Sequence, residues 1–79
     1  MFEVTWTYTH TASFDLDQIV KRVLKFMKTS ANPNDVIDRQ ILLAVDTLDE
    51  SEYFAWNEEA QRQLRQAILQ RINKIQPVN

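Results

Sequence analysis

The residues best suited to general-base chemistry lie near the N-terminus, around the single histidine of the chain, His10. A neutral imidazole takes up a proton near pH 7, and the hydroxyls of Thr9, Thr11 and Ser13 are close to it in sequence. A hydroxyl nucleophile also needs a third group that orients its base, and donors that stabilise an oxyanion. The local sequence supplies neither, so we expect His10 to end a β-strand and expect no catalytic residue.

Metal and cofactor chemistry has few residues to draw on. The chain has no cysteine and no glycine, which excludes thiolate ligands, Gly-rich phosphate loops and dinucleotide fingerprints. A lone histidine does not make a transition-metal site. The carboxylates of Asp46, Asp49 and Glu50 lack the regular spacing of a calcium-binding loop. We therefore predict no metal, no cofactor and no enzymatic activity.

The most unusual stretch combines acids with aromatic residues, and we call residues 46–59 the acidic-aromatic segment. It contains six acids, no base, and the aromatic residues Tyr53, Phe54 and Trp56. Aromatic side chains are common interface anchors, and an acidic rim steers binding toward a basic surface. The aromatics either close the end of a hydrophobic core or form a surface for a protein partner. The residues predicted for the partner surface are Asp46, Asp49, Glu50, Glu52, Phe54, Glu58 and Glu59.

The elements that position these residues begin with a strand. Strict alternation of apolar and polar residues over 2–10 predicts one β-strand, and the sequence pattern indicates no second strand. A lone strand leaves its backbone groups unpaired, and two-fold dimers are the commonest assemblies. We therefore predict a homodimer in which this strand pairs with its copy. The predicted dimer strand carries Phe2, Val4, Trp6 and Tyr8 on its apolar face.

Three helices are predicted to follow, at about 16–29, 33–48 and 51 or 58 to 75, in a single domain of residues 1–79. Asp15 is a predicted N-cap, and Asn32 followed by proline marks the second helix start. The third helix is predicted to run unbroken from about residue 51, with Tyr53 and Trp56 on its core face. The alternative is a break at Asn57. Phe54 lies off the core stripe and is predicted to be exposed. The predicted fold class is mainly α (α+β), with one strand and a small helical bundle.

A nucleic-acid alternative rests on topology and on one helix face. The order strand, helix, helix over residues 2–48 resembles that of the ribbon–helix–helix repressors, which implies a dimeric DNA-binding regulator whose paired strands enter the major groove. By that resemblance Thr5, Thr7 and Thr9 face the groove. Arg62, Arg65 and Gln66 share one side of the last predicted helix and are side chains that read bases and phosphates. The neighbouring acidic-aromatic segment opposes DNA binding electrostatically.

The preferred prediction is a small, non-enzymatic regulatory module, such as an inhibitor or adaptor. It binds an unidentified protein partner with a basic surface through its acidic-aromatic segment. The net charge of −2 favours neither nucleic acid nor membrane. No apolar run approaches the roughly 18 residues of a membrane span, and the N-terminus lacks a signal-peptide pattern. We expect a cytoplasmic location.

Overall fold

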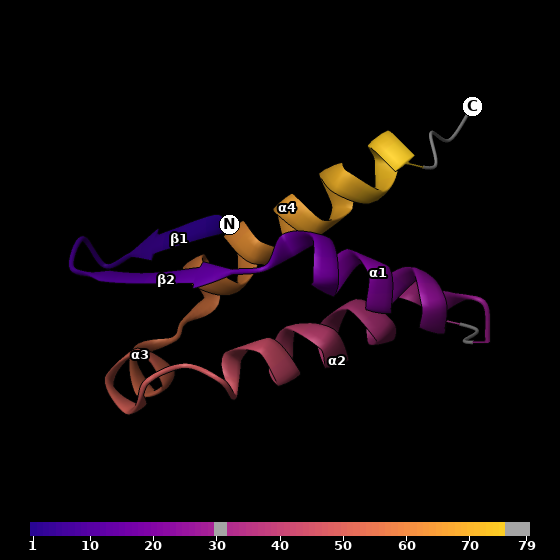
Figure 1. The fold of residues 1–79 in the computed structure, drawn as a ribbon. Coiled ribbons are helices and arrows are strands. Elements are labelled where there is room, and N and C mark those ends of the chain that lie inside the picture. The colour runs from indigo at the N-terminus through magenta and orange to yellow at the C-terminus, as the bar shows by residue number, and fades with distance from the viewer. Residues whose placement is uncertain (30–31, 76–79) are drawn as a thin grey trace.

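The computed structural model describes residues 1–29 and 32–75 (Figure 1). In the described part of the chain, its elements are β1 (Phe2–Trp6), β2 (His10–Phe14), α1 (Leu16–Met27), α2 (Pro33–Val45), α3 (Glu50–Ala55) and α4 (Glu58–Ile75). The prediction of a mainly helical protein is confirmed. The prediction of one strand and three helices is wrong, because the structure has a two-stranded sheet and four helices over these residues.

The N-terminal segment is a β-hairpin instead of the single strand predicted over residues 2–10. β1 pairs antiparallel with β2, in a register that places Phe2 opposite Phe14 and Trp6 opposite His10. The partner edge that β1 needs is therefore supplied by the same chain. This pairing removes the argument from which the homodimer was predicted. It also changes the order of elements behind the resemblance to the ribbon–helix–helix repressors, since a second strand precedes α1.

The two faces of the hairpin have different environments. Alternation continues along both strands, so one face is apolar and buried against the helices while the other is polar and exposed. The buried face carries Val4, Trp6, Ala12 and Phe14. The exposed face carries Glu3, Thr5, Thr11 and Ser13.

The hairpin turns without glycine. Thr7 and Tyr8 have φ angles of 52° and 62°, in the left-handed region that glycine occupies most easily. The Thr9 N–H donates to the Thr7 carbonyl at 2.7 Å, and the side-chain amide of Asn57 donates to the Thr7 hydroxyl at 3.2 Å. Tyr8 is fully exposed at the tip, so its predicted place on the apolar face with Trp6 is wrong.

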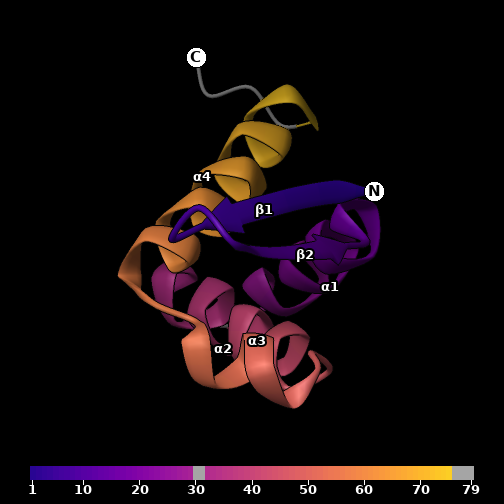
Figure 2. The same ribbon diagram turned by 90° about the vertical axis from the view of Figure 1, so that its left-hand side faces the viewer.

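One hydrophobic core gathers side chains from the hairpin and from three helices. α1 packs against α2 and α4, and α4 also packs against β1 (Figure 2). Because the buried side chains recur at helical spacing, each of these helices presents one apolar stripe to the core. The core residues are Val4, Trp6, Ala12, Phe14, Ile19, Val20, Val23, Val36, Ile37, Ile41, Val45, Ala60, Leu64, Ile68 and Ile72.

The first two helices begin at the predicted caps. The Asp15 carboxylate accepts a hydrogen bond from the Gln18 N–H at 3.1 Å at the start of α1. The Asn32 side chain accepts from the Asn34 N–H at 3.1 Å, and Pro33 occupies the first turn of α2. These caps satisfy donors that have no partner within the helix itself.

Two helices cover the region where an unbroken third helix was predicted. α3 ends at Ala55, Trp56 has an extended backbone with ψ 128°, and α4 begins at Glu58. The Asn57 side chain accepts from the Ala60 N–H at 3.0 Å, which makes Asn57 the N-cap of α4. The prediction of a continuous helix is therefore wrong, and the alternative of a break at Asn57 is observed.

The reason for this break is visible in its contacts. Ending α3 at Ala55 leaves the Ala55 carbonyl outside the helical ladder, where it accepts from the indole N–H of Trp6 at 2.8 Å. A continuous helix would direct that carbonyl toward the N–H four residues later. The buried tryptophan of β1 thus obtains its hydrogen-bond partner from the break between α3 and α4.

Candidate interaction surface

α3 is held to the rest of the molecule at its C-terminal end. The ring of Trp56 packs edge-on against Trp6 and Phe14, with centroid distances of 5.0 and 5.7 Å. Its indole N–H donates to the Gln61 side chain at 3.0 Å. Trp56 therefore closes the core beside the hairpin, as one of the two interpretations of the aromatic residues predicts.

The other two aromatic residues of the segment face outward. Phe54 is 75% exposed and Tyr53 is 43% exposed, and their rings meet edge-on at 5.4 Å. The exposure of Phe54 is confirmed. The core position predicted for Tyr53 is wrong, because the register that placed it on the core face assumed a helix continuing past Asn57. An aromatic pair exposed on a six-residue helix is an apolar contact surface at one end of the molecule (Figure 1).

The acids of the segment lie on both sides of this pair in the sequence, and in the described part of the chain they do not converge on one point. They come from the end of α2, from α3 and from the first turn of α4, where carboxylates complement the helix dipole. Asp46, Asp49, Glu50, Glu58 and Glu59 are exposed, and Glu52 is half-buried. Within the described residues, no three His, Cys, Asp or Glu side chains lie close enough together to hold a metal ion.

His10 faces an acid of α3 and not a hydroxyl. Its Nδ1 lies 3.9 Å from a carboxylate oxygen of Glu52, and its ring stacks on Trp6 at a centroid distance of 5.5 Å. No hydroxyl of the described residues forms a hydrogen bond with His10. The geometry therefore joins β2 to α3 and does not assemble a nucleophile beside its base.

The residues predicted for a dimer strand have separate environments. Val4 and Trp6 are buried in the core of their own chain, Phe2 is half-buried, and Tyr8 is exposed in the turn. The side-chain amide of Gln63 donates to the Thr5 carbonyl at 2.8 Å, so α4 occupies part of the outer edge of β1. A second copy pairing there would displace this contact. The homodimer through residues 2–10 stays a prediction.

Of the residues predicted to contact nucleic acid, one forms an ion pair within the chain and the others are exposed. Arg65 forms an ion pair with Asp38 of α2, whereas Arg62 and Gln66 are exposed. Thr5, Thr7 and Thr9 are exposed on the hairpin. Arg71 of α4 forms an ion pair with Asp17 of α1.

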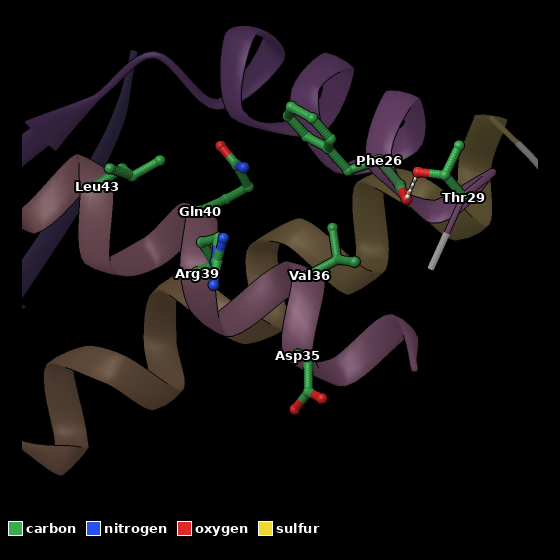
Figure 3. Close-up of a pocket in the computed structure, with 7 residues that line it drawn as sticks. All are labelled: Phe26, Thr29, Asp35, Val36, Arg39, Gln40 and Leu43. Carbon is green, nitrogen blue, oxygen red and sulfur yellow. Dashed lines mark hydrogen bonds between the residues drawn. The ribbon is translucent and has the colours of Figure 1, made fainter. Parts of the chain in front are cut away.

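Sequence reasoning missed a groove of about 460 Å³ between the C-terminal end of α1 and α2, whose side of the lining extends from Asp35 to Leu43 (Figure 3). Phe26 lines one wall and Val36 and Leu43 line the other, and Phe26 and Leu43 are 45% and 49% exposed. The sequence signal that points to it is Gln40, an amide within the apolar arc of α2. We call this feature the α1–α2 groove.

Gln40 is the only buried polar residue recorded among the described residues, with 4% exposure. No hydrogen bond joins its amide to another described residue. Every side-chain nitrogen or oxygen that is wholly buried in the described part of the chain has a hydrogen-bond partner. Because the Gln40 amide has none there, its polar atoms are not wholly buried, and they keep their exposure where Gln40 lines the groove. Figure 3 shows this amide extending from α2 toward α1, on the side where Phe26 lies.

No family model, curated protein or solved structure matches the chain. Across residues 1–29 and 32–75, no helix has the length and apolar character needed to cross a membrane.

Proposed function

We propose that the protein is a small, non-enzymatic interaction module that binds a basic protein surface through its acidic-aromatic segment. The observation that supports this most directly is Phe54, 75% exposed and stacked edge-on with the exposed Tyr53. An exposed aromatic pair is a typical interface anchor. Six acids and no base in the surrounding segment provide an electrostatic bias for a basic partner.

The attachment of α3 supports the same proposal. Trp56 and the Ala55 carbonyl fix one end of the helix to the hairpin, while none of the residues of α3 is buried. The aromatic pair is therefore presented on a short helix whose position is set by the core but whose own side chains remain available. A regulator, inhibitor or adaptor needs such a positioned contact surface and no reacting groups. The cytoplasmic location stays a prediction.

The DNA-binding alternative has weaker support. Arg65 and Arg71 of α4 form ion pairs with acids of α2 and α1. Of the four cations of α4, only Arg62 and Lys74 are outside the ion pairs of the described residues. Phosphate contacts by Lys and Arg supply most non-specific DNA affinity. On the hairpin, Glu3 shares the exposed face with Thr5, and its carboxylate would repel phosphate.

Site-specific photo-crosslinking in an extract of the native host tests the proposal. A photoreactive phenylalanine derivative at position 54 should give a discrete adduct with another protein. The same derivative at position 69, where Leu69 is 39% exposed on α4, is the matched control. Adducts that are equal at both positions would contradict the proposal.

Charge reversal tests the electrostatic part separately. Glu50→Lys should reduce the adduct formed at position 54, because it places a cation beside the aromatic pair. Glu3→Lys makes the same charge change on the exposed face of the hairpin and should leave the adduct unchanged. Equal effects of the two substitutions would show that only net charge matters.

A further inference from the structure

We propose that the acidic-aromatic segment of one copy docks in the α1–α2 groove of a second copy, so that the protein self-associates. This inference rests on the proposed function, because it uses the same segment as the binding surface and adds another copy of the chain as one of its basic partners. It differs from the predicted homodimer, since it does not involve the strand edge.

The groove has the form of a site for an apolar anchor with a polar neighbour. Phe26, Val36 and Leu43 provide apolar walls, and the volume of about 460 Å³ is within the range of known ligand pockets. The Gln40 amide lines the groove without a hydrogen-bond partner among the described residues. An occupant that covers this amide has to offer it a carboxylate or hydroxyl, because an amide that is fully buried without a hydrogen bond is unfavourable.

Lys25 and Arg39 place two cations at the groove, opposite in charge to the acids of the acidic-aromatic segment, and α1 as a whole is basic. Residues 16–29 contain four bases and one acid, Asp17, which already pairs with Arg71. The Lys25 ammonium lies 5.8 Å from the ring centroid of Phe26, and Arg39 lines the facing wall. Among the described residues, neither these four bases nor Arg39 forms an ion pair. Asp35 is the one acid in the lining.

The segment carries the groups that such a groove would select. Phe54 supplies an exposed ring for the apolar walls, and Tyr53 adds a hydroxyl beside it. The acids Glu50 and Glu58 lie within four residues of Phe54, so they would reach the cations around the groove when the ring inserts. An aromatic anchor within an oppositely charged rim is the usual arrangement of a protein interface.

Within one chain the segment does not occupy the groove. The groove is lined by residues of α1 and α2 and of the segment after α1, and by none of α3. The Ala55 carbonyl and Trp56 hold the end of α3 against Trp6 of the hairpin, which leaves Phe54 exposed. Docking therefore requires two chains, joined head to tail or as a reciprocal pair.

Sedimentation equilibrium of the purified chain is the test, run across micromolar to millimolar concentration at low salt. The average mass should rise with concentration, and added salt should reduce it, because the opposed charges are exposed. Phe54→Ala and Arg39→Glu should each raise the dissociation constant at least about tenfold, the size of a lost interface anchor. Arg62→Glu reverses an exposed cation on α4 and should leave association unchanged.

Mixing the two weakened variants completes the test. A Phe54→Ala chain keeps its groove and an Arg39→Glu chain keeps its segment, so a head-to-tail arrangement predicts a complex of one chain of each. A reciprocal pair has only one of its two contacts intact in the mixture, so mixing would not restore it. Circular dichroism confirms that both variants remain folded. Association that survives Arg39→Glu would overturn the groove as the docking site, and an equimolar mixture that stays monomeric would overturn the head-to-tail arrangement.

The outcomes separate this inference from the function on which it rests. Wild-type protein that stays monomeric at every concentration overturns self-association alone, because the crosslinks from position 54 in host extract test the proposed function independently. Self-association without any heterologous crosslink would support the inference and remove the separate partner.

Discussion

Two residues of the hairpin turn adopt a conformation that their side chains disfavour. Thr7 and Tyr8 have positive φ angles, which cost about 1–2 kcal/mol per non-glycine residue. The hydrogen bonds to the Thr7 carbonyl and hydroxyl hold this geometry, and one of them comes from Asn57 at the start of α4. The chain thus uses a contact between distant segments at a position where glycine would need none.

Replacing Tyr8 with glycine should stabilise the protein. The Tyr8 side chain is fully exposed, so its removal costs no packing, and glycine relieves the positive φ. Allowing for the greater freedom of glycine in the unfolded chain, we expect a gain of about 0.5–1 kcal/mol. Urea denaturation measures it. A lower unfolding midpoint for Tyr8→Gly than for wild type would contradict the assignment of strain to this turn.

At the scale of elements, the residues that begin helices were readable from sequence and the residues that turn the hairpin were not. Asp15 and Asn32 are side chains with a specific role at helix starts, and both cap as predicted. Thr7 and Tyr8 continue the alternating pattern and carry no turn signal. Only the tertiary contact from Asn57 shows why the chain reverses there.

Of the two candidate sites, one could likewise be predicted from the sequence and the other could not. The exposure of Phe54 follows from its position off the helical stripe, so sequence periodicity predicted it. The α1–α2 groove depends on how far apart two helices pack, and no periodicity reports that distance. The sequence feature that indicates the groove is Gln40, because its amide interrupts the otherwise apolar arc of α2.

Asn57 should be important for both α4 and the hairpin. Its carbonyl oxygen caps the Ala60 N–H and its amide donates to Thr7, so Asn57→Ala removes two hydrogen bonds. We expect a loss of about 1–2 kcal/mol in unfolding free energy. Thermal unfolding should show this as a drop of at least about 4 °C.

Asn57→Asp separates the two roles of this residue. It keeps the acceptor and adds a charge that favours a helix N-terminus, so it should recover most of the lost stability. If Asn57→Asp is as unstable as Asn57→Ala, the capping interaction is not the main contribution.

The whole molecule depends on one core shared by the hairpin and three helices. At roughly 0.05–0.15 kcal/mol per residue, a chain of this length has about 4–12 kcal/mol of stability. A single large cavity therefore removes a large fraction of the total. This makes the distinction between core and surface positions measurable with one substitution of each kind.

Leu64→Ala should cost about 2–5 kcal/mol, because Leu64 is completely buried on α4. Leu69→Ala, at a partly exposed position on the same helix, should cost less than about 1 kcal/mol. Urea unfolding followed by circular dichroism and by tryptophan fluorescence should give coincident transitions for both variants. Equal costs for the two substitutions, or transitions that separate, would contradict a single shared core.

The contacts between the hairpin and α4 have a consequence for synthesis on the ribosome. Gln63 and Thr5 are hydrogen-bonded across 58 positions, and Trp6 and Ala55 across 49. The hairpin emerges first, yet its buried face has no complete cover until α4 has been translated, several seconds later at typical elongation rates. Val4 and Trp6 stay open to solvent and to chaperones during that interval. Nascent chains stalled before α4 should therefore be captured by chaperones, whereas chains stalled well beyond it should be released.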